Sequence, residues 1–235
     1  MKKLAILSYH KIGPPPEGGW ESWYYVSAET FAEHLQWLRS RRYEPIDIHT
    51  FYRGLDDPST LPAKSTLITF DDGYRNNLTV ALPVMRRLGF PGVIFVPTQY
   101  IGGINEWDTN NEPVERICDW DELLELEKGG VAVESHSVSH PAFSLLTPAQ
   151  QEDELRRSKE TLESVLGRTV ELFGYPYGDA GADAAFSRDA LRRTGYRAAC
   201  LYGGGAVTLP DADRFRLERL AIGPDSDLPG LLGEK

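Results

Sequence analysis

Two short clusters of polar residues combine the residue types that bind divalent metals in proteins. Asp71 and Asp72 are adjacent and are followed by Gly73, and His136 and His140 lie four positions apart. Two imidazoles and one carboxylate leave open coordination positions on a divalent metal, which metal-assisted hydrolysis requires. The same ligand set also describes non-haem iron oxygenases, so the residue types alone leave both chemistries open.

Each cluster taken alone also fits an ordinary structural role. Asp-Asp-Gly is common in turns and at helix starts, and two histidines four positions apart are as often an ordinary surface pair. Neighbouring side chains of an extended chain point to opposite sides, so we expect Asp71 and Asp72 to have different roles. One carboxylate would bind a metal while the other faces substrate or water.

The elements that must position these clusters alternate between strands and helices along the chain. Short apolar runs predict strands at residues 4–9, 66–70, 92–96, 131–134, 170–173, 196–201 and 216–222. The clearest helix start is the capping box at Thr147-Pro148-Ala149-Gln150. Repeated strand–helix units imply a parallel sheet, and seven strands favour a barrel over an open doubly wound sheet. We expect one domain over residues 1–235.

Polar residues directly follow four of these predicted strands. In chain order they are His10, Asp71-Asp72, His136 with His140, and Tyr175-Pro176-Tyr177-Gly178. The carboxyl ends of parallel strands meet at one mouth of a barrel, where the active sites of such folds lie. The strand positions therefore predict that all four groups gather in one site.

The overall composition excludes some classes of partner. The 35 acidic and 25 basic residues give a net charge of -10, which argues against a binder of nucleic acid or anionic membranes. Neither Cys118 nor Cys200 belongs to a C-x-x-C pair. No apolar run is long enough to span a membrane, and no signal-peptide cleavage site follows the first strand. We expect a cytoplasmic protein, or an exported one if a leader has been removed; the sequence does not predict the oligomeric state.

Three motifs together resemble a known enzyme family. Thr69-Phe70-Asp71-Asp72-Gly73, His136-Ser137-x-x-His140-Pro141 and Tyr175-Pro176-Tyr177-Gly178 are similar to motifs of the polysaccharide deacetylases, carbohydrate esterase family 4 with its NodB-homology domain. The resemblance covers nearly the whole chain. Tyr9-His10 at the end of the first strand matches the branch that contains the poly-N-acetylglucosamine deacetylases. The resemblance implies an α/β fold, a distorted (β/α) barrel of about seven parallel strands.

The resemblance also implies a role for each matching residue. Asp72, His136 and His140 would bind a divalent metal, with zinc expected and cobalt, nickel or iron accepted by some members of the family. Asp71 would be the general base, with metal-bound water as the nucleophile. The backbone N–H of Tyr177 would stabilise the oxyanion, and His10 would be the general acid. A histidine that only caps a buried strand is the alternative for His10.

The implied substrate is an N-acetylated sugar in a glycan or glycoconjugate. Three aromatic residues are expected to contact it: Tyr74, Trp107 and Tyr175. Two alternatives stay open, an O-acetyl esterase acting on a polysaccharide such as xylan and a glycan-binding relative with impaired turnover.

Two departures from the family pattern affect the catalytic groups. Many members orient the base with an arginine at the position of Gly174, and here we expect either no such group or a replacement from elsewhere. Arg219 is one candidate for the replacement, although the sequence favours an ordinary surface or ion-pair role for it. No histidine follows His140, which favours His10 as the proton donor.

Overall fold

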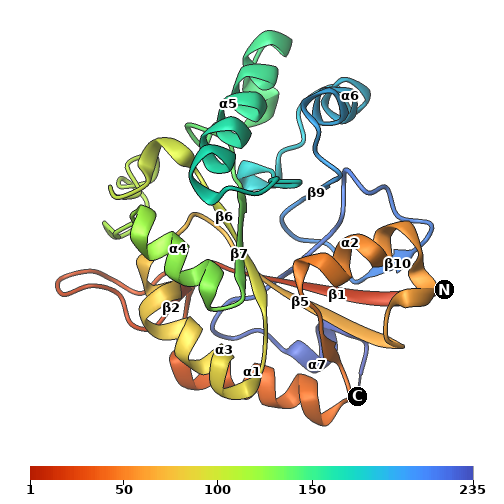
Figure 1. The fold of residues 1–235 in the computed structure, drawn as a ribbon. Helices are drawn as coiled ribbons and strands as arrows, with labels where there is room; N and C mark the ends of the chain where they lie inside the picture. Colours follow the sequence, from red (N-terminus) through yellow and green to blue (C-terminus); the bar gives the residue numbers. More distant parts are fainter. Residues whose placement is uncertain (235) are drawn as a thin grey trace.

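A strongly curled sheet forms the frame of the protein (Figure 1). The computed structural model describes residues 1–234. Six strands run parallel in the order β1, β5, β6, β7, β8, β9, with bounds Lys2–Tyr9, Lys64–Phe70, Gly92–Val96, Val131–Ser135, Leu172–Gly174 and Ala198–Cys200. Strand β10 (Val207–Leu209) adds to β1 in the antiparallel direction. The two-residue strand β4 (Glu44–Pro45) pairs with the start of β5, and β2 (Lys11–Ile12) with β3 (Tyr25–Val26) forms a separate two-stranded sheet.

The chain after β10 runs back between the two ends of the curled sheet. Leu217 forms a parallel bridge with Cys200 of β9, and β11 (Leu220–Ala221) pairs in parallel with β1. The fold is therefore a half-barrel of about seven strands, and the expected distorted barrel is confirmed. The expected last strand at residues 216–222 is shorter than predicted and serves as this connection between β9 and β1.

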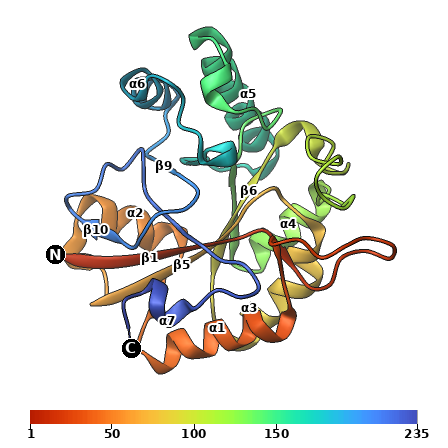
Figure 2. The same cartoon turned by 180° about the vertical axis from the view of Figure 1, so that it is seen from behind.

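Within residues 1–234, seven α-helices accompany the sheet, mostly on its convex face (Figures 1 and 2). Their bounds are α1 Ala28–Ser40, α2 Ile48–Asp56, α3 Leu82–Leu88, α4 Trp120–Lys128, α5 Pro148–Leu166, α6 Ala184–Thr194 and α7 Leu228–Leu231. A π-helical turn, Asn77–Ala81, leads into α3, and 3-10 turns lie at Pro58–Thr60, Thr98–Tyr100, Phe143–Leu145 and Pro176–Gly178. The predicted capping box at Thr147 and Gln150 begins α5, where each side chain bonds the other residue's backbone N–H.

Alternation along the strands divides the core into two clusters. Ala5, Leu7 and Tyr9 of β1 pack with the apolar faces of α1, α3, α4, α5 and α6. Leu4 and Ile6 belong instead to a cluster with side chains from β8 and β9 at the other end of the sheet, from the neighbouring β10 and from α2. Residues from both ends of a sheet can meet only on its concave side, so this second cluster fills the inside of the half-barrel.

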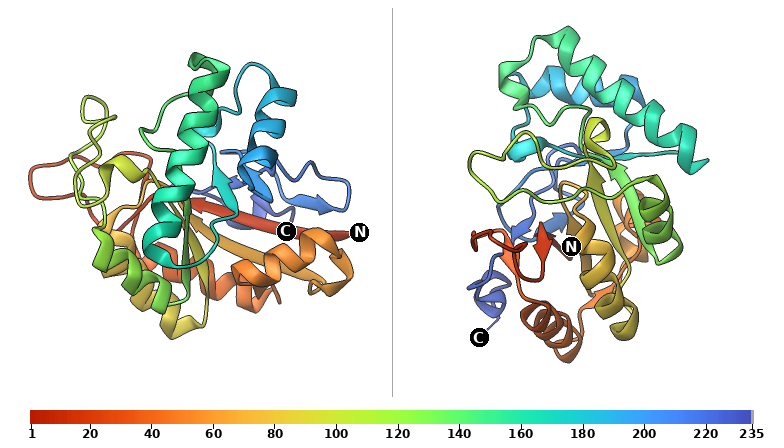
Figure 3. Two further views of the ribbon diagram at one scale, coloured as in Figure 1. Left: turned by 45° about the horizontal axis from the view of Figure 1, so that its top comes forward. Right: turned by 90° about the vertical axis from the view of Figure 1, so that its left-hand side faces the viewer.

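Two long loops leave the carboxyl ends of the parallel strands on the same side of the molecule. One follows β1 and contains β2 and β3, and the other follows β6; both lie on the left in Figure 1, and the two termini lie at the opposite end of the molecule (Figure 3). The two loops therefore lie where the sequence places its candidate catalytic residues.

Among residues 1–234 no helix is long and apolar enough to cross a membrane.

Candidate active site

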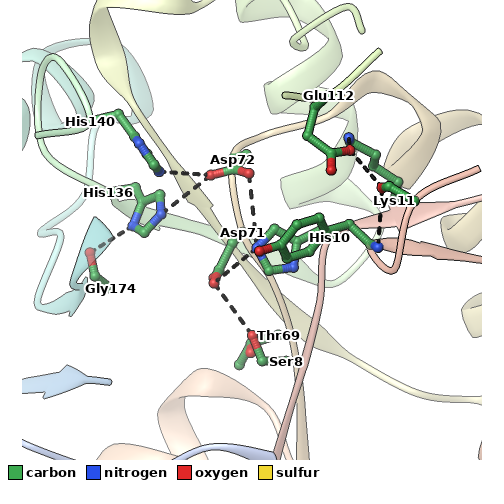
Figure 4. A network of polar contacts seen from close by, with 12 residues as sticks. Ser8, His10, Lys11, Thr69, Asp71, Asp72, Glu112, His136, His140 and Gly174 are labelled. Atoms are coloured by element: carbon green, nitrogen blue, oxygen red, sulfur yellow. Dashed lines mark hydrogen bonds and ion pairs between the residues drawn. The ribbon is translucent and has the colours of Figure 1, made fainter. Parts of the chain in front are cut away.

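The polar residues that follow β1, β5 and β7 converge on one pocket, as Figure 4 shows. The pocket encloses a volume of about 50 Å³, is open to solvent, and has both acidic and aromatic walls. Its lining residues are His10, Lys11, Tyr24, Asp71, Asp72, Tyr74, Trp107, Asp108, Glu112, His136, His140, Tyr177 and Tyr202. The structure thus brings together the residues that the strand-end argument places at one mouth.

One oxygen of Asp72 faces both candidate histidine ligands. Asp72 Oδ1 lies 3.1 Å from Nε2 of His140 and 3.4 Å from Nε2 of His136, and all three side chains are buried. Bonds of about 2.0–2.1 Å at tetrahedral angles would separate ligand atoms by about 3.3–3.4 Å. The three atoms are therefore spaced as the ligands of one divalent cation would be.

The hydrogen bonds around the histidines provide a second test of that site. His136 Nδ1 lies 2.7 Å from the carbonyl oxygen of Gly174, so this nitrogen must carry a proton. In the neutral imidazole, Nε2 then has a lone pair directed at the carboxylate of Asp72. Asp72 Oδ1 is buried and has no hydrogen-bond partner among the described residues. A divalent cation held between these two acceptors would satisfy both of them, so the donor set fits a bound metal.

The backbone around these ligands adopts a conformation that side chains normally avoid. The angle φ is 73° at Asp72, 69° at Ser137, 57° at His140 and 58° at Tyr177. Left-handed backbone at residues other than glycine is uncommon and concentrates at functional sites. At Asp72 it also corrects the sequence argument: the chain is not extended there, and both neighbouring carboxylates face the pocket. The two carboxylates differ in the groups that they contact and not in the side of the chain to which they point.

Asp71 is paired with a buried arginine. The guanidinium of Arg219 donates from one nitrogen to Asp71 Oδ1 at 2.7 Å and from the other to Oδ2 at 2.8 Å. A third nitrogen of Arg219 donates to the carbonyl of Leu201, and the arginine is fully buried. Burial would raise the pKa of Asp71, but the charge of Arg219 outweighs this effect and the pKa lies below its ordinary value. Asp71 is thus ionised and fixed in orientation.

Arg219 supplies the orienting arginine that the family resemblance places at the position of Gly174. The surface role that the sequence favoured for Arg219 is wrong, because its side chain is buried against Asp71. A Cβ atom on Gly174 would lie 2.8 Å from Phe95 and 3.1 Å from His136 Nδ1, which leaves no space for a larger residue. The Arg219 guanidinium lies 5.2 Å from the centre of the Phe95 ring. The Phe95 ring therefore occupies the space beside Gly174 and packs against Arg219, which lies directly before β11.

His10 faces the two aspartates from the end of β1. Its Nε2 lies 3.9 Å from Asp71 Oδ2 and 4.0 Å from Asp72 Oδ2. The ring is held between Tyr24, at 4.6 Å between centroids, and Tyr202, at 5.2 Å. Burial lowers the pKa of His10, and the charges of Asp72 and Asp71 act in the opposite direction. The imidazole is thus close enough to both carboxylates to exchange a proton with a group bound between them.

The aromatic residues expected to contact substrate occupy different positions. Trp107 lines the pocket and stacks on His140, with centroids 4.6 Å apart and an interplanar angle of 26°. Tyr74 lines the pocket with little exposed surface, whereas Tyr177 is 58% exposed and has a pKa raised to about 12 by burial and nearby carboxylates. Tyr175 is buried against Phe143 and Phe173, so the expected substrate contact of Tyr175 is not supported.

Several wall residues were missed by sequence reasoning. They are Lys11, Tyr24, Asp108, Glu112 and Tyr202. Tyr24, Asp108 and Glu112 lie in the two long loops, and loops of this length are usually either functional or flexible insertions. Nothing in the sequence indicated which of their side chains would point inward.

Comparisons with known proteins agree with this geometry. The family described as polysaccharide deacetylase matches residues 59–199. A putative polysaccharide deacetylase of Bacillus subtilis, YxkH, is 27% identical over 222 residues, covering 94% of this chain and 72% of the relative. A poly-beta-1,6-N-acetyl-D-glucosamine N-deacetylase of Staphylococcus epidermidis is 25% identical over 211 residues, covering 86% and 70%.

A solved structure shares the fold across almost the entire chain. IcaB from Ammonifex degensii has a TM-score of 0.81 and 25% sequence identity, and the match covers 96% of this chain and 94% of that one. The family match contains Asp71, Asp72, His136, His140 and Tyr177. This chain belongs to the polysaccharide deacetylase family.

Proposed function

We propose that the protein is a metal-dependent deacetylase that hydrolyses the N-acetyl group of a sugar residue in a glycan or glycoconjugate. The observation that carries the proposal is the separation of partners between two adjacent carboxylates. Asp72 lies against the imidazole nitrogens of His136 and His140, whereas both oxygens of Asp71 accept hydrogen bonds from Arg219. One carboxylate is thus arranged to hold a cation and the other to accept a proton.

Asp72, His136 and His140 would hold the cation, with zinc as the expected metal. A divalent cation at this position would polarise the acetyl carbonyl and lower the pKa of a water molecule. Asp71 accepts a proton from the attacking water, and Arg219 keeps that carboxylate ionised and aimed at the pocket. Without the guanidinium, burial would favour the protonated form of Asp71.

His10 lies across the pocket from the base and donates a proton to the departing nitrogen. Water adds to the carbonyl, the C–N bond breaks, and the products are acetate and a free amine. The amine is a poor leaving group unless it is protonated, so this step needs an acid. The backbone N–H of Tyr177 is our candidate for the second support of the oxyanion.

The acetyl-sugar substrate is supported by the aromatic walls and by the relatives. Tyr24, Trp107 and Tyr177 line the pocket, and aromatic rings offer flat apolar surfaces to sugar faces. The S. epidermidis relative is named for deacetylation of a poly-N-acetylglucosamine. The objection that the base lacks an orienting arginine, which favoured a relative without turnover, is removed by Arg219.

Acetate release tests the proposal directly. The zinc-loaded protein is incubated with N-acetylglucosamine oligomers and, separately, with acetylated xylan, and free acetate is measured. We expect release from the oligomers, loss of release after the metal is stripped with a chelator, and recovery when zinc is restored. Release from acetylated xylan alone would replace the amidase by an esterase, and release that persists after complete metal removal would refute the proposed chemistry.

A further inference from the structure

A second buried ion pair lies at the pocket wall and has no part in the proposed chemistry. Lys11 Nζ is 2.6 Å from Glu112 Oε2, and the two side chains are 1% and 7% exposed (Figure 4). The ammonium group also lies over the rings of Tyr25, at 4.6 Å, and Tyr74, at 5.0 Å. Ser22 Oγ donates to the same Glu112 oxygen at 2.6 Å. Every group around the pair is therefore arranged to hold it in one position.

The ion pair connects the two long loops that form the pocket walls. Lys11 directly follows His10, and its loop also carries Tyr24. Glu112 belongs to the opposite loop, which carries Trp107 and Asp108 into the pocket.

Two further contacts join the same loops. The hydroxyl of Tyr25 donates to Glu115 Oε1 at 2.9 Å. The chain at Gly19 comes so close to Pro113 that an added Cβ would lie 3.3 Å from the proline Cβ. The loops therefore touch at several points, and the buried ion pair includes the residue that directly follows His10.

Hydrogen bonds within the loop that carries Glu112 connect its segments, so we expect the loop to move as a single unit. The buried side chain of Asn105 donates to the carbonyl of Pro113 at 3.0 Å and accepts from the N–H of Glu115 at 2.7 Å. Backbone bridges join Ile104 to Arg116 and Tyr74 to Ile117. A shift at Glu112 would thus be transmitted to Trp107, which stacks on the candidate metal ligand His140.

We propose that Lys11 and Glu112 are positioning residues: their ion pair locks the Tyr24 wall to the Trp107 wall and so sets the width of the sugar-binding pocket. This inference rests on the proposed function for its enzymatic consequence. A buried ion pair is a costly way to add stability, because well-packed apolar residues often stabilise equally well. The expected benefit is therefore geometric, and it should be visible in substrate binding more than in the chemical step.

Three variants and one control separate positioning from stability. Lys11→Met and Glu112→Gln each break the pair. Lys11→Met/Glu112→Leu replaces it with apolar side chains, which should recover stability without restoring the geometry. Arg168→Met is the matched control, because it also strips a cation from a buried carboxylate, Glu134, but does not line the pocket.

The first readout is steady-state kinetics of the zinc-loaded enzymes on N-acetylglucosamine oligomers and on p-nitrophenyl acetate. We expect KM for the oligomers to rise about tenfold in both single variants and to stay raised in the double variant, with a smaller change in kcat. Hydrolysis of the small ester should change less, because it does not span both walls. The control should lose thermal stability with KM unchanged. Recovery of KM together with stability in the double variant would overturn the inference.

The second readout is hydrogen exchange of the same zinc-loaded proteins, which requires no turnover. We expect faster exchange in both loops, residues 11–26 and 97–118, whichever partner of the pair is replaced. Faster exchange confined to the loop that carries the substitution would show that the walls are not coupled and would overturn the inference. An inactive wild-type protein would refute the proposed function, while the exchange result would still decide whether the walls are locked.

Discussion

Asp71 and Asp72 are neighbours in the chain, yet the two halves of the pocket that surround them differ in chemistry. The Asp71 half contains a guanidinium that bonds both carboxylate oxygens, with His10 nearby. The Asp72 half contains two imidazole nitrogens that approach one oxygen, and no arginine or lysine bonds that carboxylate among the described residues. Each half contains an aspartate, and the two aspartates differ in the side chains that contact their carboxylates.

The difference shows how a protein gives one residue type two functions. A carboxylate whose oxygens are filled by a fixed organic cation has no position left for a metal, but it remains available for proton transfer at the edge of the ion pair. A buried carboxylate with an unpartnered oxygen between two imidazoles has an unmet need for positive charge. The following variants are designed to break or sharpen this contrast.

Asp71→Asn should give the largest loss of turnover with the metal half intact. Asparagine fills the same space but cannot accept the proton, so we expect kcat to fall by about 10²–10⁴-fold. Acetate release from N-acetylglucosamine oligomers measures the loss. Turnover within about threefold of wild type, well short of the effect of a general base, would assign the base to another group.

Arg219→Met should leave Asp71 as an uncompensated buried charge. The free energy of unfolding of the metal-free protein should fall by about 3–5 kcal/mol, which urea denaturation would measure. Asp71→Asn/Arg219→Met should lose less stability than Arg219→Met, since no lone charge remains. Arg156→Met is the control, because its ion pairs on α5 are exposed and should contribute no more than about 1 kcal/mol. Equal effects of Arg219→Met and Arg156→Met would contradict the buried pairing.

His10→Ala tests the acid that faces the base. We expect kcat/KM for the amide substrate to fall by about 10²-fold and that for p-nitrophenyl acetate to fall much less, because a phenolate leaves without a proton. His49→Ala is the matched control, since that histidine is exposed on α2. If amide and ester hydrolysis survive equally in His10→Ala, His10 is not the acid.

Gly174→Ala should weaken the support of the candidate metal ligand His136. The added methyl group would press on Phe95 and on the nitrogen that bonds the Gly174 carbonyl. We expect zinc affinity to fall by about 10–100-fold, the usual effect of altering a group that orients a ligand. Titration with a competing chelator measures it, with Gly205→Ala as control because a Cβ there meets only one side-chain atom, at 3.5 Å. An unchanged affinity would show that the Gly174 contact does not orient His136.

The sequence predicted the residues whose positions follow from strand order. His10, Asp71 and His136 each directly follow a buried parallel strand, so the geometry of a parallel barrel brings them to one mouth whatever the details of the loops. The capping box of α5 was predictable for a similar reason, because its two partners are three residues apart.

Contacts between distant, irregular segments could not be predicted in this way. Arg219 lies 148 positions from Asp71, just before a strand of two residues, and no local pattern marks it as buried. Lys11 and Glu112 are 101 positions apart and belong to loops without regular periodicity. The left-handed backbone at Asp72 reversed the expected direction of one side chain, because tertiary contacts can hold a residue in a region of φ that its type disfavours.

Zinc binding by Asp71→Asn and Asp72→Asn, measured side by side after removal of all metal, tests the division between the two aspartates most directly. We predict that Asp71→Asn binds zinc with the stoichiometry and affinity of the wild-type protein although its turnover is lost. Asp72→Asn should lose zinc binding, because it removes the only carboxylate among the three candidate ligands. Equal loss of zinc in both variants would contradict the account, since Asp71 would then be a ligand and not a separate base.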